Sequence, residues 1–328
     1  MSEEIIRVEH LKKYFQVRSG FFSKSHKVLK AVDDVSFTIR KGEIFGVVGE
    51  SGCGKSTLAR CILRLGDVTD GNVFFQGHDI SRLKPAQLKE YRSKMQMVFQ
   101  NPFSSFNPSM TIRQTFLEIG RVYGMERAAT EERSRELVRQ VRLPEDILLR
   151  RPNELSGGQL QRLAIARALF LNPPFILADE AVSALDVSVQ AQILNLILDL
   201  RDSLGLTMLF ISHDLTVVEH LCDTVLVMYL GSVVELAPTR ELFANLLHPY
   251  SQALVSAKPR EHPDAPANRI MLEGEAKSAI DGGSGCRFAP RCRYFQSGKC
   301  DCDTPVLREV TPGHFVACHR YDETEEKQ

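Results

Sequence analysis

The feature that most constrains this 328-residue chain is a glycine-rich stretch at residues 49–57, which reads Gly-Glu-Ser-Gly-Cys-Gly-Lys-Ser-Thr. It follows an apolar run at residues 44–48 that predicts a buried strand, and it leads into residues 56–63, which predict a helix. A glycine loop between a strand and a helix directs backbone N–H groups and the helix dipole toward an anion. The spacing fits G-x-x-x-x-G-K-[ST], so the stretch predicts a nucleotide phosphate-binding loop in an α/β fold.

All nine residues of this loop are expected to contact the nucleotide: Gly49, Glu50, Ser51, Gly52, Cys53, Gly54, Lys55, Ser56 and Thr57. The Lys55 ammonium can reach the β- and γ-phosphates, and the Ser56 hydroxyl can bind Mg²⁺. We therefore expect ATP and Mg²⁺ as the ligands. The Cys53 thiol is expected to be open to thiol reagents, whereas Cys61 and Cys222 are expected to be buried packing residues.

Three further apolar runs end in polar side chains: Asp179 and Glu180 end one, His213 follows the second and Gln100 the third. Because the carboxyl ends of parallel strands share one edge of a sheet, these groups are expected to converge on one nucleotide. Asp179 and Gln100 are expected to hold the Mg²⁺ shell. Glu180 is the candidate general base that polarises the attacking water, and Gln100 can contact that water as well. His213 is the candidate sensor of the γ-phosphate, with a structural histidine as the alternative.

Residues 155–159 read Leu-Ser-Gly-Gly-Gln, the signature of ATP-binding cassette (ABC) ATPases. The phosphate loop, Gln100, the signature, the acidic pair, residues 183–186 and His213 follow one another in the order of that family. The chain therefore resembles an ABC transporter ATP-binding subunit. The resemblance implies a P-loop NTPase fold with a RecA-like core, an antiparallel β subdomain and a helical signature subdomain at about residues 101–170.

The resemblance also assigns roles to residues outside the phosphate loop. Ser156, Gly157, Gly158 and Gln159 would contact ATP held by the opposite subunit, and Asp186 would lie on a loop that crosses to that subunit.

Phe15 stands where the family stacks an aromatic ring on adenine, with Tyr14 as the fallback. A core aromatic is the alternative interpretation of Phe15.

Two longer stretches narrow the resemblance to dipeptide and oligopeptide importer ATPases. The first is residues 95–108, and the second is residues 242–250, which ends in His-Pro-Tyr. An insertion at residues 18–27 resembles the second (F-type) of the two paralogous ATPase subunits in such importers. This implies an ATP-driven motor with a paralogous ATPase subunit, two integral membrane permeases and, indirectly, an extracytoplasmic solute-binding protein.

Residues 101–123 are expected to receive a cytoplasmic helix of a permease. Phe103, Phe106 and Phe116 are the expected apolar anchors of that contact. The alternative is that these phenylalanines pack within the helical subdomain.

Charge and hydropathy limit the remaining function classes. Lys plus Arg and Asp plus Glu each number 41, so the net charge is zero, which argues against nucleic acid as a partner. No apolar run approaches the roughly 18 residues of a membrane span, and the first residues do not read as a signal peptide. The expected location is the cytoplasmic face of the inner (cell) membrane, as a peripheral subunit.

Three alternatives to the function of a peptide importer motor remain open. They are a soluble ABC ATPase acting on nucleic acid or ribosomes, the motor of an exporter, and an importer motor for nickel or another non-peptide solute.

The chain is expected to contain an ABC ATPase domain at residues 1–257, a linker at 258–285 and a cysteine-rich extension at 286–328. Five of the eight cysteines lie in that extension, and a cytosolic cluster of this kind favours metal over disulfides. Some members of the resembled family carry a [4Fe–4S] cluster in a tail of this form.

That resemblance implies Cys286, Cys292, Cys300 and Cys318 as the cluster ligands. Cys302 would be a spare thiol, because Pro305 stands at the family's distance after Cys300. Zinc and reduced structural cysteines are the alternatives. His314 and His319 are further candidate ligands, each with a solvent-exposed histidine as the alternative.

Overall fold

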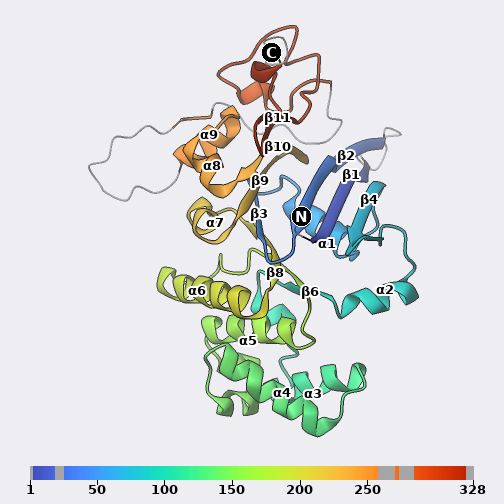
Figure 1. Cartoon of the computed structure of the whole chain (residues 1–328), viewed down its shortest axis with the longest axis vertical. Helices are drawn as coiled ribbons and strands as arrows, with labels where there is room; N and C mark the ends of the chain where they lie inside the picture. Colours follow the sequence, from blue (N-terminus) through green and yellow to red (C-terminus); the bar gives the residue numbers. More distant parts are fainter. Residues whose placement is uncertain (1–2, 19–25, 258–269, 273–283, 323–328) are drawn as a thin grey trace. The chain divides into compact units, whose positions relative to one another are not determined.

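The computed structural model describes residues 3–18, 26–257, 270–272 and 284–322 (Figure 1). The chain divides into two compact units. The signature unit comprises Met1–Glu3, Arg40–Gly42 and Leu83–Ile211, and the phosphate-loop unit comprises Glu4–Ile39, Glu43–Arg82 and Ser212–Gln328.

The phosphate-loop unit contains an antiparallel sheet with the strand order β2-β1-β4-β5. Its strands are β1 (Glu4–Arg18), β2 (His26–Arg40), β4 (Asp70–Phe75) and β5 (His78–Asp79). A second run of paired strands in the same unit has the order β11-β12-β10-β9-β3. These are β3 (Ile44–Val48), β9 (Thr224–Tyr229), β10 (Ser232–Pro238), β11 (Arg308–Thr311) and β12 (His314–Val316).

Strand β3 is the buried strand that the sequence predicted, with all five residues buried, and it pairs in parallel with β9. The helices of this unit are α1 (Lys55–Ile62), α7 (Leu215–Leu221), α8 (Thr239–Ala244) and α9 (Pro249–Ser256), with short 3₁₀ turns η4 (Ala289–Arg291) and η5 (His319–Tyr321).

The described part of the cysteine-rich extension continues the strands of this unit. β12 pairs antiparallel with β10, with Glu235 opposite Val316 and Leu236 opposite Phe315. The Ala317 N–H also donates to the Val234 carbonyl at 2.9 Å. Residues 258–269 and 273–283 of the predicted linker lie outside the described residues, and the predicted domain boundaries remain predictions.

The signature unit contains three parallel strands in the order β8-β7-β6. They are β6 (Met95–Val98), β7 (Phe175–Asp179) and β8 (Thr207–Ser212). Its helices are α2 (Pro85–Arg92), α3 (Ile112–Val122), α4 (Arg127–Gln140), α5 (Gly157–Leu169) and α6 (Val187–Leu204), with 3₁₀ turns η1 (Pro102–Ser105), η2 (Glu145–Leu149) and η3 (Pro152–Glu154).

Helices α3 and α4 lie side by side in this unit (Figure 1). They approach closely at Gly120, where an added Cβ would lie 2.2 Å from Oγ1 of Thr130. Phe116 on α3 is fully buried and stacks on Phe170 with ring centroids 5.5 Å apart. Since Phe106 is buried as well, the expectation that Phe106 and Phe116 anchor a permease is wrong. Only Phe103, which is 49% exposed, remains available for that contact.

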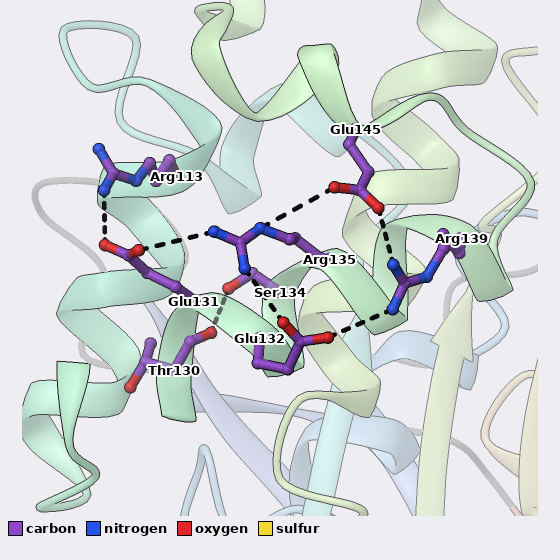
Figure 2. A network of polar contacts seen from close by, with 8 residues as sticks. All are labelled: Arg113, Thr130, Glu131, Glu132, Ser134, Arg135, Arg139 and Glu145. Atoms are coloured by element: carbon purple, nitrogen blue, oxygen red, sulfur yellow. Dashed lines mark hydrogen bonds and ion pairs between the residues drawn. The ribbon is translucent and has the colours of Figure 1, made fainter. Parts of the chain in front are cut away.

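Charged side chains on α4 form a chain of ion pairs (Figure 2). Glu131 accepts a hydrogen bond from Arg113 of α3 at 2.5 Å, and Arg139 donates to Glu145 of η2 at 2.7 Å. These pairs lie near the surface, where each contributes at most about 1 kcal/mol. The buried apolar contacts of Phe116 therefore contribute more to the packing of α3 than the ion pairs do.

The variant Phe116→Ala should lower the free energy of unfolding by about 3–5 kcal/mol, because it leaves a cavity beside Phe170. The matched variant Phe103→Ala should change it by less than about 0.5 kcal/mol, because that ring faces solvent. Urea unfolding followed by circular dichroism measures both values. Equal effects of the two substitutions would contradict the packing described here.

Candidate nucleotide-binding site

The phosphate loop connects β3 to α1 along a path that requires glycine. Gly54 has φ 108°, and an added Cβ would lie 2.1 Å from the Ala31 carbonyl oxygen. An added Cβ at Gly49 would lie 2.3 Å from the Met228 carbonyl oxygen. Helix α1 begins at Lys55, directly after Gly54, so its first N–H groups face the loop. The local chain therefore has the geometry of an anion cradle.

The Lys55 ammonium lies inside this loop. Its side chain is only 5% exposed, and Nζ donates to the carbonyl oxygens of Gly49 at 2.7 Å and Glu50 at 3.0 Å. Ser51 and Gly52 are exposed at the tip of the loop, and Ser56 is half-buried in the first turn of α1. A phosphate group bound in the loop would therefore meet the Lys55 cation.

The expected reactivity of Cys53 is wrong. Its side chain is 3% exposed, and burial raises the pKa of the thiol above its usual value. A buried, protonated thiol is a poor nucleophile. Cys61 and Cys222 are buried as predicted, and burial raises the pKa of the Cys61 thiol to about 11.

The two aromatic candidates for adenine stacking differ in their surroundings. Phe15 is 42% exposed on β1, so the alternative of a core aromatic does not fit. The Tyr14 hydroxyl donates to the Asp33 carboxylate. Burial and this hydrogen bond raise the pKa of Tyr14. Phe15 is therefore the more accessible of the two rings, with the Lys13 ammonium 5.0 Å from its centroid, whereas Tyr14 is held in place.

In the signature unit, Gln100 and Glu180 come together. Gln100 Nε2 donates to the Glu180 carboxylate at 2.9 Å and lies 3.4 Å from Oγ of Ser183. Glu180 has φ 49°, a left-handed conformation that is uncommon for a residue other than glycine. Its N–H donates to the Ile211 carbonyl at 3.0 Å. This conformation and the two hydrogen bonds fix the position of the Glu180 carboxylate, as a catalytic role requires.

The remaining predicted catalytic groups are divided between the two units. Asp179 ends β7, opposite Ile211 of β8, and is half-buried. His213 is exposed and belongs to the phosphate-loop unit, as the loop itself does. The assembled site with Lys55, Glu180 and His213 around one nucleotide therefore remains a prediction.

The signature residues form the start of α5. The Ser156 hydroxyl accepts a hydrogen bond from the Gln159 N–H at 3.3 Å, and Gln159 Oε1 accepts from the Ser156 N–H at 3.0 Å. This capping box fixes the first turn. Ser156 and Gly157 are exposed, so the N-terminus of α5 is open to a ligand from outside the chain.

Two more features complete the signature region. An added Cβ on Gly158 would lie 2.5 Å from Cγ1 of Val189, so this glycine permits close packing of α5 on α6. Asp186 is exposed at the start of α6, and its side chain does not cap that helix.

Sequence reasoning missed two residues that hold the phosphate loop. The Tyr250 hydroxyl accepts a hydrogen bond from the Glu50 N–H at 2.8 Å, and Arg291 donates to the Glu50 carboxylate at 3.0 Å. The His-Pro-Tyr stretch was a signal for Tyr250, but nothing local to either residue indicates the loop as its partner.

Four cysteines of the C-terminal extension line one cavity: Cys286, Cys292, Cys300 and Cys318. Burial raises the pKa of the Cys286 thiol to about 11, and the neighbouring thiols contribute to this shift. Cys302 is exposed and lies outside the lining, with Sγ 3.7 Å from a carboxylate oxygen of Asp301. In the part of the chain that the structure describes, no group of three or more His, Cys, Asp or Glu side chains is arranged to hold a metal ion, and this includes the four cysteines of the cavity.

The expectation of solvent-exposed histidines in this extension is wrong. His314 is fully buried, and its Nε2 lies 2.8 Å from the Glu235 carboxylate. His319 is 9% exposed, with Nδ1 2.8 Å from Asp322 and Nε2 2.8 Å from the Asp303 carbonyl. Both ring nitrogens of His319 are therefore engaged within the protein, and His314 does not line the cavity.

Comparison with known families identifies two matched regions. Residues 32–183 match the ABC transporter family, and residues 234–300 match the oligopeptide/dipeptide transporter C-terminal region. A probable peptide ABC transporter ATP-binding protein of Sinorhizobium fredii, y4tS, is 48% identical over 97% of this chain and 90% of its own length. The oligopeptide transport ATP-binding protein AppF of Bacillus subtilis is 48% identical over 97% of this chain and 98% of its own length.

Solved structures of ABC cassettes have the same fold. The dimeric post-hydrolysis structure of the cassette MJ0796 with ADP and Pi has a TM-score of 0.64 and 29% identity, covering 72% of this chain and 99% of that one. The cbiO1 structure from Clostridium perfringens has a TM-score of 0.65 and 25% identity, covering 74% and 92%. These matches confirm the predicted P-loop NTPase fold of an ABC ATPase.

The fold, the phosphate loop and the signature at the start of α5 define this chain as an ABC-type ATPase. With near full-length identity of 48% to its relatives, it belongs to the ABC transporter ATP-binding proteins that carry the oligopeptide/dipeptide transporter C-terminal region. ATP hydrolysis coupled to transport is the activity of this class. No helix among the described residues is sufficiently long and apolar to span a membrane.

The variant Lys55→Ala should abolish ATP binding, raising the Kd by at least about 100-fold, because it removes the one cation inside the loop. Isothermal titration of the purified chain with ATP measures this. Arg60→Ala, an exposed residue on the same helix, is the matched control and should bind normally. Retained micromolar affinity in Lys55→Ala would overturn the assignment of the loop.

Proposed function

We propose that this chain is the ATP-hydrolysing motor of a membrane importer for dipeptides or oligopeptides, as the second of two paralogous ATPase subunits. The observation that carries the substrate class is the match of residues 234–300 to the oligopeptide/dipeptide transporter C-terminal region. The name of the Bacillus subtilis relative, an oligopeptide transport protein, supports the same class. An exporter motor or a soluble ATPase acting on nucleic acid or ribosomes is not favoured by any matched region.

The chain's own residues perform distinct steps in this proposal. Lys55 and the backbone N–H groups of residues 49–57 bind the β- and γ-phosphates and neutralise their charge. Ser56, Asp179 and Gln100 would hold Mg²⁺, which would further neutralise the phosphate oxygens. Glu180 accepts the proton of the attacking water, and the hydrogen bond from Gln100 keeps its carboxylate oriented. His213 contacts the γ-phosphate, and Phe15 stacks on the adenine.

The open N-terminus of α5 supports a composite site between two subunits. Ser156, Gly157, Gly158 and Gln159 would contact ATP held by the paralogous subunit, and Asp186 would approach the same interface. ATP binding then closes the pair and hydrolysis reopens it. Two permeases convert this motion into transport at the cytoplasmic face of the membrane, where Phe103 offers an exposed apolar contact.

Reconstitution tests this function. The chain is purified with its paralogue and permeases, placed in lipid vesicles with the solute-binding protein, and assayed for ATP-dependent uptake. Peptides should enter and stimulate ATP hydrolysis, whereas nickel complexes should do neither. Uptake of nickel without peptide uptake would replace the peptide assignment.

The variant Glu180→Gln should bind ATP but hydrolyse it about 10²–10⁴-fold more slowly, because the general base is lost. The ATP-bound dimer should then accumulate. Phosphate release and size-exclusion chromatography with ATP measure the two effects. Glu136→Gln, an exposed position on α4, is the control. Near-normal turnover in Glu180→Gln would move the base elsewhere, with His213 as the next candidate.

We also propose that the C-terminal extension binds a [4Fe–4S] cluster through Cys286, Cys292, Cys300 and Cys318. What supports this proposal is that these four cysteines line one cavity. When bound, a cluster would cross-link the segments that carry these cysteines, so its role would be structural or regulatory. The chain's own contribution is to bring four buried thiols together and to keep Cys302 apart.

Anaerobically purified protein should be brown and contain about four irons per chain. Cys286→Ser or Cys318→Ser should bleach it, because each removes a ligand, whereas Cys302→Ser should leave colour and iron content unchanged. Iron analysis and visible absorption measure the outcome. Colourless protein with one tightly held zinc would support the zinc alternative, and metal-free protein would leave the cysteines as packing residues.

A further inference from the structure

Glu50, the second residue of the phosphate loop, is held at two points by the C-terminal part of the chain. Its N–H donates to the Tyr250 hydroxyl at 2.8 Å, and its carboxylate accepts from Arg291 Nη1 at 3.0 Å and 3.2 Å. Tyr250 lies 200 residues from Glu50 in the sequence and Arg291 lies 241 residues away. All three residues belong to the phosphate-loop unit.

The partners of Glu50 in these contacts are largely buried. The Arg291 side chain is 10% exposed and the Glu50 side chain 35%. Tyr250 is fully buried and packs against Tyr229 and Phe288, with ring centroids 4.7 and 5.5 Å away. A charge-assisted hydrogen bond in such a setting is stronger than one on an open surface. The contacts therefore restrict where Glu50 can lie.

The position of Glu50 matters because its carbonyl oxygen has two further partners within the loop. It accepts from Lys55 Nζ at 3.0 Å and from the Cys53 N–H at 3.2 Å. A shift of Glu50 would move the carbonyl that orients the Lys55 ammonium. The contacts of Tyr250 and Arg291 with Glu50 therefore also affect the position of the Lys55 ammonium, on which phosphate binding depends.

We propose that Arg291 and Tyr250 are positioning residues that set the affinity of the phosphate loop for ATP by fixing Glu50. The inference rests on the proposed role of the loop as the ATP site. Neither side chain needs to touch the nucleotide.

The segment of residues 286–292, which carries Arg291, also contacts strand β2. This strand lies next to β1, which carries Phe15, the candidate for adenine stacking. Arg287 donates to the Asp33 carboxylate and to the Leu230 carbonyl, and Asp33 accepts from Tyr14, the neighbour of Phe15. Both arginines lie between Cys286 and Cys292, two of the four cysteines that line the cavity.

The experiment is isothermal titration of the purified full chain with ATP and with ADP. Arg291→Ala should raise the Kd for ATP about tenfold, because a charge-assisted contact to the loop is lost. Tyr250→Phe should raise it about threefold to tenfold, because only the acceptor of the Glu50 N–H is removed. Arg291→Lys should recover part of the loss. Arg293→Ala is the matched control and should bind as the unmodified chain does, because Arg293 contacts Gln252 instead of the loop.

Four readouts separate positioning from a general loss of structure. Iron content and the thermal midpoint of Arg291→Ala should stay close to those of Arg293→Ala. In the reconstituted transporter, KM for ATP should rise while kcat stays within about twofold. The exchange Glu50→Arg with Arg291→Glu should bind ATP more tightly than either single variant.

Unchanged ATP affinity in both Arg291→Ala and Tyr250→Phe would overturn the inference. So would a loss of affinity that appears equally in Arg293→Ala or that tracks the loss of iron. If the unmodified chain itself failed to bind ATP, the loop assignment would fail instead, and the two failures are thus distinguishable.

Discussion

The close backbone packing around the phosphate loop is the constraint on which the rest of the site depends. The Gly231 N–H donates to the Cys53 carbonyl at 2.7 Å, and the Gly231 carbonyl accepts from the Asp33 N–H at 2.8 Å. The turn between β9 and β10 therefore joins the loop to β2 through main-chain hydrogen bonds. Because Gly54 lies against the Ala31 carbonyl, no side chain fits there, and the loop keeps the shape in which Lys55 points inward.

A second constraint acts on the candidate base in the signature unit. Glu180 adopts a left-handed backbone conformation that is unfavourable for its residue type, and hydrogen bonds to Ile211 and Gln100 hold it there. The segment that follows Gln100 is the one expected to meet a permease. A displacement of Gln100 would therefore act directly on the Glu180 carboxylate through their hydrogen bond.

The described part of the C-terminal extension belongs to the phosphate-loop unit. Strand β12 pairs with β10, and the fully buried Glu235 accepts from His314 and from the Leu247 and His248 N–H groups. Phe288 inserts between Tyr229, His248 and Tyr250. These buried contacts bring the cysteine-lined cavity and the phosphate loop into one packed body, although more than 200 residues separate them in the sequence.

The sequence by itself determined the features that depend on neighbouring residues. The strand–glycine loop–helix unit at residues 44–62, the Ser156–Gln159 capping box and the acidic pair at the end of β7 follow from short-range backbone chemistry, which the residue order specifies directly. Only the tertiary structure decided that Phe116 faces Phe170, that His314 is buried against Glu235, and that Tyr250 and Arg291 hold Glu50. These contacts join distant segments, and which side of a helix or turn is covered depends on the partner that packs against it. The residues next to such a contact in the sequence do not specify its partner, because the free energy of the contact arises when both surfaces leave water together.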